Sequence, residues 1–389
     1  MPERVDAVVA GHICLDIIPD LRARTFAFQP GHLLETGPAV VATGGPVSNT
    51  GMALHILGIE TRLMGKTGDD AFGRTLRGVV ASRSDDLARG MKIAAGEHTS
   101  YTVILSPQGA DRMFLHCPGC NDTFGAEDID YSMVSRARLL HFGYPPLMRR
   151  LIEDGGRELV VLLRRAKETG VIVSLDMTMP DPDGFSGSVD WPSILTAALP
   201  FVDIFLPSLD ETLFTLDPAE WRRRAAAATA VPTPALLDSV ARRLLALGPS
   251  IVGLKLGEHG IYLRTGPHGG IPDAADGRWV GRELWAPCFQ VDVIGTTGAG
   301  DATIAGFLAG LLRNLGPEDC LTAATAVGAC SVEAPDALGG VLPWEPMLQR
   351  VSRGWPRRAI PVGRGPWRRH ESSGLWHGPS DPVREGTRA

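Results

Sequence analysis

A glycine-rich turn at residues 295–301, Gly-Thr-Thr-Gly-Ala-Gly-Asp, combines residue types that suit the transfer of a phosphoryl group. It leads directly into a run of small and apolar residues that predicts a buried helix. The N-terminus of a helix presents unpaired amides and the positive end of its dipole, and small side chains let an anion approach them. Such a cradle meets the charge of a migrating phosphoryl group. Asp301, at the start of the helix, is placed to stay ionised and to accept a proton from a substrate hydroxyl as a general base.

The same turn also allows a simpler interpretation, in which Asp301 caps the helix and the glycines only make a tight turn. The stretch is not the P-loop G-x-x-x-x-G-K-[ST], because no lysine follows the glycines. It also departs from the dinucleotide motif G-x-G-x-x-G, because Gly298 and Gly300 are followed by Thr303. By itself the turn therefore leaves phosphate binding and a purely structural role open.

The elements that must position this turn alternate between strands and helices from about residue 130 onward. Short apolar runs predict strands at 138–142, 171–175, 202–206 and 250–255. Amphipathic stretches predict helices at 147–169, 191–199 and 234–247. This alternation indicates parallel strands joined by crossover helices, with functional sites at the C-terminal ends of the strands.

The first third of the chain adds strand-rich segments to this core. A short apolar run predicts a buried strand at 7–11, and a helix is predicted at 49–57. The segments at about 12–43 and 99–122 would form a smaller appendage on the sheet. The second of them alternates in polarity and predicts a hairpin whose turn lies at 106–109.

Composition and charge describe a globular protein and exclude several function classes. Of the 389 residues, 44% are hydrophobic and 21% charged, and the net charge is −6, which argues against a nucleic-acid binder. No apolar run is long enough to span a membrane, and the acidic start at 1–6 does not match a signal peptide. The six cysteines are scattered and are expected to be reduced and mostly buried, so we expect a cytoplasmic protein.

The composition changes after about residue 351. Residues 353–389 contain eight arginines against three acidic residues, with interspersed Pro, Gly and Ser and no periodicity. This pattern predicts a disordered tail. Trp355, Trp367 and Trp376 are unusual in such a tail and allow the alternative that it docks on a surface.

Several motifs together resemble one family. The glycine-rich turn resembles the C-terminal signature Asp-Thr-Thr-Gly-Ala-Gly-Asp of the PfkB-type carbohydrate kinases, the ribokinase-like family, and matches it at six of seven positions. Gly44, Gly45, Asn49, Gly58 and the stretch 65–73 resemble the N-terminal signature. Residues 207–211 are similar to the family's Asn-x-x-Glu element, and 255–260 are similar to its turn beside the nucleotide.

This resemblance covers roughly residues 5–350 and implies a fold and an activity. The expected fold is a three-layer α/β/α sandwich with a mostly parallel central sheet and a small β-rich lid, in a kinase domain at 1–350 followed by the tail at 351–389. The expected activity is transfer of the γ-phosphoryl group of ATP, with Mg²⁺, to a hydroxyl of a sugar or sugar derivative. Lid strands with free edges would allow a homodimer. No nucleic acid or membrane partner is expected.

The resemblance also implies roles for individual residues. It implies that Asp301 is the base and that the anion hole for the phosphoryl group consists of the amides of Gly298, Ala299 and Gly300. The implied nucleotide-binding residues are Lys255, Gly257, Gly260 and Thr297. Glu211 would help to hold Mg²⁺. The implied substrate-binding residues are Asp16, Gly44, Gly45 and Asn49, to which Asn121 and Asp176 are added more loosely.

Two departures from the family pattern bear on the site. Gly295 stands where the family has an aspartate that belongs to a monovalent-cation site, and Asp292 lies three residues too early to replace it, so potassium activation is doubtful. Ser208 replaces the asparagine of the Asn-x-x-Glu element, which predicts a change in tuning rather than a loss of activity.

Other functions stay open on the sequence alone. The same fold could phosphorylate a nucleoside, or it could be a non-catalytic binding module, although the intact Gly-Ala-Gly-Asp turn argues for catalysis. Cys117-x-x-Cys120 could bind zinc or act as a dithiol, but no second such pair exists and the motif lies in the lid segment.

Overall fold

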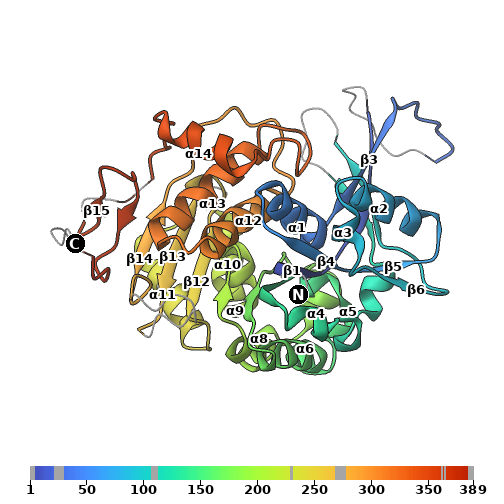
Figure 1. Cartoon of the computed structure of the whole chain (residues 1–389), viewed down its shortest axis with the longest axis horizontal. Helices are drawn as coiled ribbons and strands as arrows, with labels where there is room; N and C mark the ends of the chain where they lie inside the picture. Colours follow the sequence, from blue (N-terminus) through green and yellow to red (C-terminus); the bar gives the residue numbers. More distant parts are fainter. Residues whose placement is uncertain are drawn as a thin grey trace.

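A ten-stranded mixed sheet runs through the molecule in the computed structural model, which describes residues 5–21, 30–106, 113–227, 231–267, 277–360, 362 and 365–383 (Figure 1). Six neighbouring strands are parallel, in the order β4 (Thr61–Met64), β1 (Val5–Gly11), β9 (Ala137–Gly143), β10 (Ile172–Leu175), β11 (Ile204–Phe205) and β12 (Ile251–Lys255). Four antiparallel strands continue the sheet: β13 (Ile261–Thr265), β14 (Glu283–Ala286), β16 (Trp376–His377) and β15 (Arg368–Arg369). The predicted alternation and the mostly parallel sheet are confirmed.

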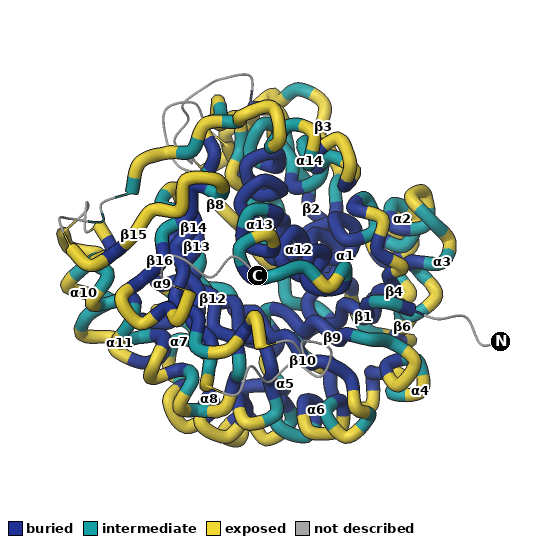
Figure 2. The backbone as a smooth tube through the Cα atoms, turned by 60° about the vertical axis from the view of Figure 1, so that its left-hand side comes forward, coloured by how far each residue is buried: buried dark blue, intermediate teal, exposed yellow. Residues whose placement is uncertain are grey.

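Helices cover both faces of this sheet because its central strands are apolar on both sides. In β1, Ala7 and Val9 belong to one buried cluster, whereas Val8 and Ala10 belong to the other. The first cluster packs against α1 (Pro46–Ile56), α2 (Ala71–Ala81), α3 (Asp85–Ala88), α12 (Ala299–Leu312), α13 (Pro317–Ser331) and α14 (Trp344–Ser352). The second packs against α4 (Tyr131–Val134), α5 (Arg149–Ile152), α6 (Arg157–Glu168), α8 (Trp191–Ala198), α9 (Leu209–Leu216) and α11 (Pro234–Leu245). The chain also forms the helices α7 (Phe185–Ser188) and α10 (Pro218–Ala226). Figure 2 shows the parallel strands of the main sheet and α12 buried between exposed outer surfaces.

A second, four-stranded sheet forms the predicted appendage. Its order is β3 (Ala39–Gly44), β2 (Cys14–Pro19), β7 (Tyr101–Leu105) and β8 (Met113–Cys117), and β5 (Lys66–Gly68) pairs with β6 (Lys92–Ala94) nearby. β7 and β8 are antiparallel, which confirms the predicted hairpin. Its turn at 106–109 falls, apart from Ser106, outside the described residues.

One predicted helix differs from the structure. Residues 147–169 were expected to form a single helix, but the chain makes short turns and α5 before α6 begins at Arg157. Gly155 and Gly156 have φ angles of 68° and 77°, a left-handed conformation that interrupts a right-handed helix. The amphipathic pattern continued across these glycines and concealed the break.

The C-terminal tail is ordered where the structure describes it, so the prediction of disorder is wrong for 351–360 and 365–383. β16 pairs with β14, and β15 pairs with β16, which extends the main sheet by two strands. Trp367 and Leu375 are buried against this edge. Buried Asp381 accepts hydrogen bonds from the guanidinium of Arg282, which is 3% exposed. Burial of apolar surface and a paired charge outweigh the compositional bias of the tail. Within the described residues, no helix has the length and apolar character needed to traverse a bilayer.

Candidate active site

The glycine-rich turn forms the N-terminus of α12. Gly298 adopts a left-handed φ of 72°, and a Cβ atom added to it would lie 2.3 Å from the Cβ of Ala337, so only glycine fits. Gly298 is the N-cap of α12 and has no side chain, so it leaves the first backbone amides of the helix uncovered. The amides next to Asp301 therefore face a cavity with the positive end of the helix dipole.

Asp301 lies in the first turn of α12 and is 1% exposed. Its carboxylate accepts hydrogen bonds from Asn49 Nδ2 at 2.9 Å and Thr50 Oγ1 at 3.3 Å. The hydroxyl of Tyr144 lies 3.1 Å from both carboxylate oxygens. These donors fix the carboxylate and join α1 and the end of β9 to α12. Burial raises the pKa of Asp301, although the hydrogen bonds and Lys255 oppose this shift.

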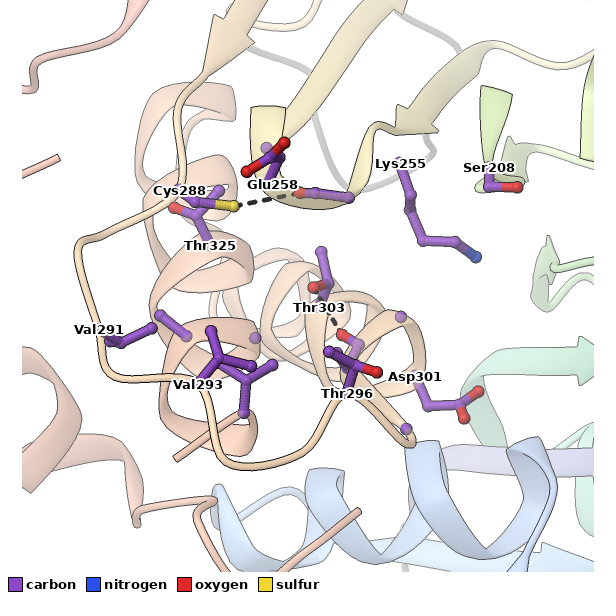
Figure 3. Close-up of a pocket in the computed structure, with 18 of the residues that line it drawn as sticks. Ser208, Lys255, Glu258, Cys288, Val291, Val293, Thr296, Asp301, Thr303 and Thr325 are labelled. Atoms are coloured by element: carbon purple, nitrogen blue, oxygen red, sulfur yellow. Dashed lines mark hydrogen bonds between the residues drawn. The ribbon is translucent and has the colours of Figure 1, made fainter. Parts of the chain in front are cut away.

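A cavity of about 480 Å³ opens between the turn after β12 and the N-terminus of α12. It is lined at one side by Lys255, Ser208, Glu211 and the backbone of 298–301, and at the other by apolar side chains that include Val291, Val293 and Val332. Figure 3 shows Lys255 and Asp301 on the same side of this space, away from the two labelled valines. The cavity thus has a polar end and an apolar end, as small-molecule sites commonly do.

Lys255 ends β12 and lies beside the glycine-rich turn. Its Cε atom is 3.6 Å from the position that a Cβ atom would take on Gly300. Its Nζ atom donates to Asp176 Oδ1 at 2.5 Å and to the carbonyl of Leu206 at 2.7 Å. Burial alone would lower the pKa of Lys255, but the carboxylates of Asp176 and Glu211 outweigh burial and raise it. Lys255 is therefore a charged group inside the site and not a solvated surface lysine.

Glu211 and Ser208 form a reciprocal cap at the start of α9. The Ser208 amide donates to Glu211 Oε2 at 2.7 Å, and the Glu211 amide donates to Ser208 Oγ at 3.1 Å. Both residues line the cavity. Ser208, which replaces the family asparagine, thus fixes the Glu211 carboxylate toward the polar end of the cavity. Desolvation raises the pKa of Glu211, and Lys255 opposes it.

Asp16 and its neighbours lie on the lid sheet. Asp16 is 6% exposed on β2, and a Cβ atom on Gly44 would lie 2.4 Å from its Oδ2 atom, so a side chain at position 44 would displace this carboxylate. Burial raises the pKa of Asp16 to about 6. Gly45 lies against His12 and immediately precedes α1. Asn49, on α1, donates a hydrogen bond to Asp301.

His12, Tyr144 and Thr50 are site residues that sequence reasoning missed. His12 is 2% exposed, and within the described part of the chain neither ring nitrogen has a hydrogen-bond partner. Its ring centroid lies 5.4 Å from that of His116 and 6.3 Å from that of Tyr144. Burial lowers the pKa of His12 to about 3, so the imidazole is neutral. A signal was available, because His12 and Tyr144 directly follow strands at their C-terminal ends.

Other predicted site residues divide into those that line the cavity and those that do not. Gly257 and Gly260 line it, whereas Thr296 lines it in place of Thr297. Asn121 is buried, and its amide group exchanges hydrogen bonds with the backbone of Ile13, at 2.9 Å to the carbonyl and 3.4 Å from the amide. These bonds hold the segment that carries His12, and Asn121 is not among the residues that line the cavity, so its contact with the acceptor stays a prediction.

Within the described residues, nothing supports the zinc or dithiol alternative for Cys117 and Cys120. No group of three or more His, Cys, Asp or Glu side chains there is arranged to hold a metal ion. All six cysteines are free. Cys120 Sγ donates to the carbonyl of Lys66 at 3.1 Å, and burial raises the pKa of Cys120 to about 11, which disfavours the thiolate.

Comparison with known proteins identifies relatives along most of the chain. The model of the pfkB family of carbohydrate kinases matches residues 6–344. An uncharacterized sugar kinase of Archaeoglobus fulgidus is 27% identical over 292 residues, which cover 75% of this chain and 98% of the relative. An ATP-dependent ribose-1-phosphate kinase of Halopiger xanaduensis is 28% identical over 286 residues, covering 74% of this chain and 79% of the relative. A probable chloroplastic fructokinase of Arabidopsis thaliana is 25% identical over 351 residues, covering 85% and 78%.

Solved structures share the fold. Arabidopsis thaliana ribokinase, complexed with ribose and ATP, superposes with a TM-score of 0.68 at 19% identity and covers 89% of this chain and 98% of that one. Xylella fastidiosa fructokinase with bound ATP gives a TM-score of 0.67 at 20% identity, with the same coverage. The predicted fold class and family are therefore confirmed. The chain belongs to the pfkB family of carbohydrate kinases, phosphotransferases that use an alcohol group as acceptor.

Proposed function

We propose that this protein transfers the γ-phosphoryl group of ATP to a hydroxyl of a sugar or sugar derivative, with Asp301 as the general base. The observation that carries the proposal is the position of the Asp301 carboxylate. It lies at the N-terminus of α12, at the edge of the nucleotide-sized cavity. It is held by Asn49 of α1, which follows the lid strand β3, and by Tyr144, which follows β9 of the main sheet.

The residues around the carboxylate divide the work of the reaction. The acceptor hydroxyl would give its proton to Asp301 as its oxygen attacks the γ-phosphorus, and the bond from that phosphorus to the bridging oxygen would break and release ADP. The amides of Gly298, Ala299 and Gly300, with the helix dipole, would stabilise charge on the transferring group. Lys255, already charged through Asp176 and Glu211, would stand beside the same phosphates.

The donor set also fits Mg²⁺ bound together with a nucleotide. Asp176 Oδ2 is buried without a hydrogen-bond partner among the described residues, and Glu211 lines the polar end of the cavity. Mg²⁺ is usually held by one or two carboxylates together with substrate phosphates and water. When bound, it would neutralise phosphate charge, and Glu211 would hold it directly or through water.

For the acceptor we propose a neutral hydroxylated molecule bound between Asp301 and the lid sheet. Asp16 presents carboxylate oxygens that can accept from two neighbouring hydroxyls, and the unpartnered nitrogens of neutral His12 can exchange hydrogen bonds with a third. A carboxylate and a neutral imidazole favour sugar hydroxyls over a phosphorylated sugar. Gly44, Gly45 and Asn49 would shape the same pocket. Because the proposed donor is ATP, we place the activity in the cytoplasm.

We propose that potassium does not activate this enzyme. A Cβ atom on Gly295 would lie 2.8 Å from the carbonyl oxygen of Ala334 and 3.0 Å from that of Pro335, so the family aspartate does not fit this backbone. Equal rates in KCl and in NaCl at the same ionic strength would support this proposal, whereas a several-fold stimulation by KCl would contradict it.

We also propose that the lid sheet mediates a homodimer. Its edge strands β3 and β8 expose Val40, Val41, Met113, Phe114 and Leu115, which are 46–58% exposed. Apolar edge strands are suited to pairing with a second copy. Light scattering should report a dimer for the wild type and a monomer for Phe114→Glu. A wild-type monomer would refute the proposal.

An ATP-consumption screen over neutral sugars, sugar phosphates and nucleosides tests the central proposal. We expect turnover with one or more neutral sugars and a dependence on Mg²⁺. Turnover only with nucleosides would support a nucleoside kinase instead. No turnover with any acceptor, combined with no ATP binding in calorimetry, would favour a non-catalytic role.

A further inference from the structure

A short segment of the tail, residues 355–358, lies against the wall of the nucleotide cavity. It follows α14 and lies outside the residues that match the family model, which end at 344. The amide of Gln290 donates to the carbonyl of Pro356 at 2.8 Å, and the amide of Arg358 donates to the carbonyl of Cys288 at 2.8 Å. Phe289 and Arg357 form the antiparallel bridge between these bonds. The tail thus pairs with the loop that contributes Cys288 and Phe289 to the cavity.

Side chains reinforce this pairing. The Arg357 guanidinium donates to four groups at 2.6–3.2 Å, namely the carbonyls of Pro287 and Ser373 and the hydroxyls of Thr325 and Thr322. It also lies 4.1 Å from the centre of the Phe289 ring, which stacks on Trp355 with centroids 4.5 Å apart. Phe289 is 2% exposed and lines the cavity. Arg357 therefore holds one wall of the cavity in place through Phe289.

Arg358 itself reaches the cavity. Its side chain lines it and forms an ion pair with Glu258 at 2.9 Å, in the turn between β12 and β13. The two side chains are 45% and 62% exposed, and ion pairs this accessible contribute little to stability. A ligand can therefore replace Glu258 as the partner of Arg358 at low cost. Figure 3 shows Glu258 beside Cys288, apart from Asp301, so Arg358 lies toward the nucleoside end and not the phosphate end.

We propose that the tail segment 355–358 is part of the nucleotide site, with Arg358 as a nucleotide-binding residue and Arg357 as a positioning residue. The inference rests on the proposed function in that the ligand is ATP. A planar guanidinium can stack on a base or donate hydrogen bonds to its edge and to the ribose, which suits the end of the cavity where the apolar wall begins. The transferring phosphate stays at the other end, beside Lys255 and α12.

Isothermal calorimetry with MgATP and MgADP, together with steady-state kinetics, tests this assignment on the full chain. Arg358→Ala should raise the Kd of both nucleotides by about tenfold, as expected for loss of a charge-assisted contact. The KM of the acceptor and the kcat at saturating ATP should stay unchanged. Arg357→Lys keeps the positive charge but loses the planar guanidinium that donates to Pro287 and the two threonines. It should therefore raise the KM of ATP and leave the KM of the acceptor unchanged.

Two controls separate nucleotide contact from a structural effect. Arg353→Ala removes an exposed arginine of the same tail outside the cavity and should leave nucleotide binding unchanged. Glu258→Gln breaks the ion pair but frees Arg358, so it should tighten ATP binding. A weakening in Glu258→Gln equal to that in Arg358→Ala would show that only the ion pair matters and would overturn the proposal.

The remaining outcomes are equally decisive. Wild-type affinity in Arg358→Ala would refute the contact, and a loss confined to ATP would place Arg358 at the γ-phosphate instead of the nucleoside. If the wild type binds no nucleotide at all, the proposed function fails first, and this result is distinct from a variant that binds as tightly as a functional wild type.

Discussion

Replacement of Asp301 by asparagine tests the proposed base with little change in shape. The amide oxygen of asparagine can still accept the hydrogen bond from Asn49, and its NH₂ group can donate to the Thr50 hydroxyl, which can rotate to accept. The variant therefore keeps its buried contacts but cannot take up a proton. General bases contribute about 10²- to 10⁴-fold to turnover. We expect kcat to fall by about 10³-fold, equivalent to about 4 kcal/mol of activation free energy.

The expected effect on folding has the opposite sign. Because burial raises the pKa of Asp301 in the folded state, its ionised form costs stability at every pH above that pKa. A neutral asparagine avoids this cost, so Asp301→Asn should melt at the same temperature as the wild type or higher at pH 8. Calorimetric binding of MgATP should persist, because the amides of α12 and Lys255 are unchanged.

The assay is coupled ATP consumption with the best acceptor, and Asp210→Asn is the matched control. Asp210 is also in the first turn of a helix, α9, but it is exposed and outside the cavity. The control should keep wild-type kcat. A kcat within tenfold of the wild type in Asp301→Asn would refute the base assignment. Loss of activity together with a lower melting temperature and lost ATP binding would show a structural role instead.

Three further predictions concern the acceptor side and the tail. The KM of the acceptor should rise as the pH falls below about 6, because burial raises the pKa of Asp16 to about 6 and its protonated form accepts hydroxyl bonds poorly; a pH-independent KM would contradict this. His12→Ala should raise the acceptor KM by about tenfold without changing that of ATP, and equal effects on both would argue against an acceptor contact. Asp381→Asn should lower the free energy of unfolding by about 3 kcal/mol in urea titrations, because it removes the fully buried carboxylate partner of Arg282 and leaves the pairing with Glu318, which is 26% exposed; the difference should shrink in acid, because the lowered pKa of Asp381 means that its contribution is lost as it protonates.

The parts of the site that could be predicted from the sequence are those whose residues lie next to one another in the chain. The turn 295–301 carries its chemistry in order, because small residues, a helix start and an acid are all local features. Capping of α9 follows the same logic, since Ser208 and Glu211 lie three residues apart in a known capping pattern. Parallel strands could be predicted from their apolar runs.

Residues that meet only through the fold could not be predicted. Lys255 and Asp176 are 79 residues apart, and Asn49 and Asp301 are 252 apart, so no local pattern shows that each pair shares a hydrogen bond. The prediction of a disordered tail failed for the same reason. Its arginine-rich composition indicates disorder, but Asp381 finds its partner Arg282 99 residues earlier. Composition describes a segment only as an average over its residues. It therefore does not show that the tail forms a buried ion pair and two short strands with distant parts of the chain.

The carboxylates of the site are not fully neutralised by the positive charge around them. Asp176, Glu211 and Asp301 surround a single lysine, Lys255, and the raised pKa of each acid reflects burial that one ammonium group does not fully offset. Bringing a nucleotide's phosphates into this field would add more negative charge, so ATP alone would bind poorly. A Mg²⁺ ion bound with the phosphates would offset part of this added charge, and it would lower the pKa of a carboxyl group that holds it, such as that of Glu211. The site should therefore bind the magnesium complex of ATP more tightly than free ATP.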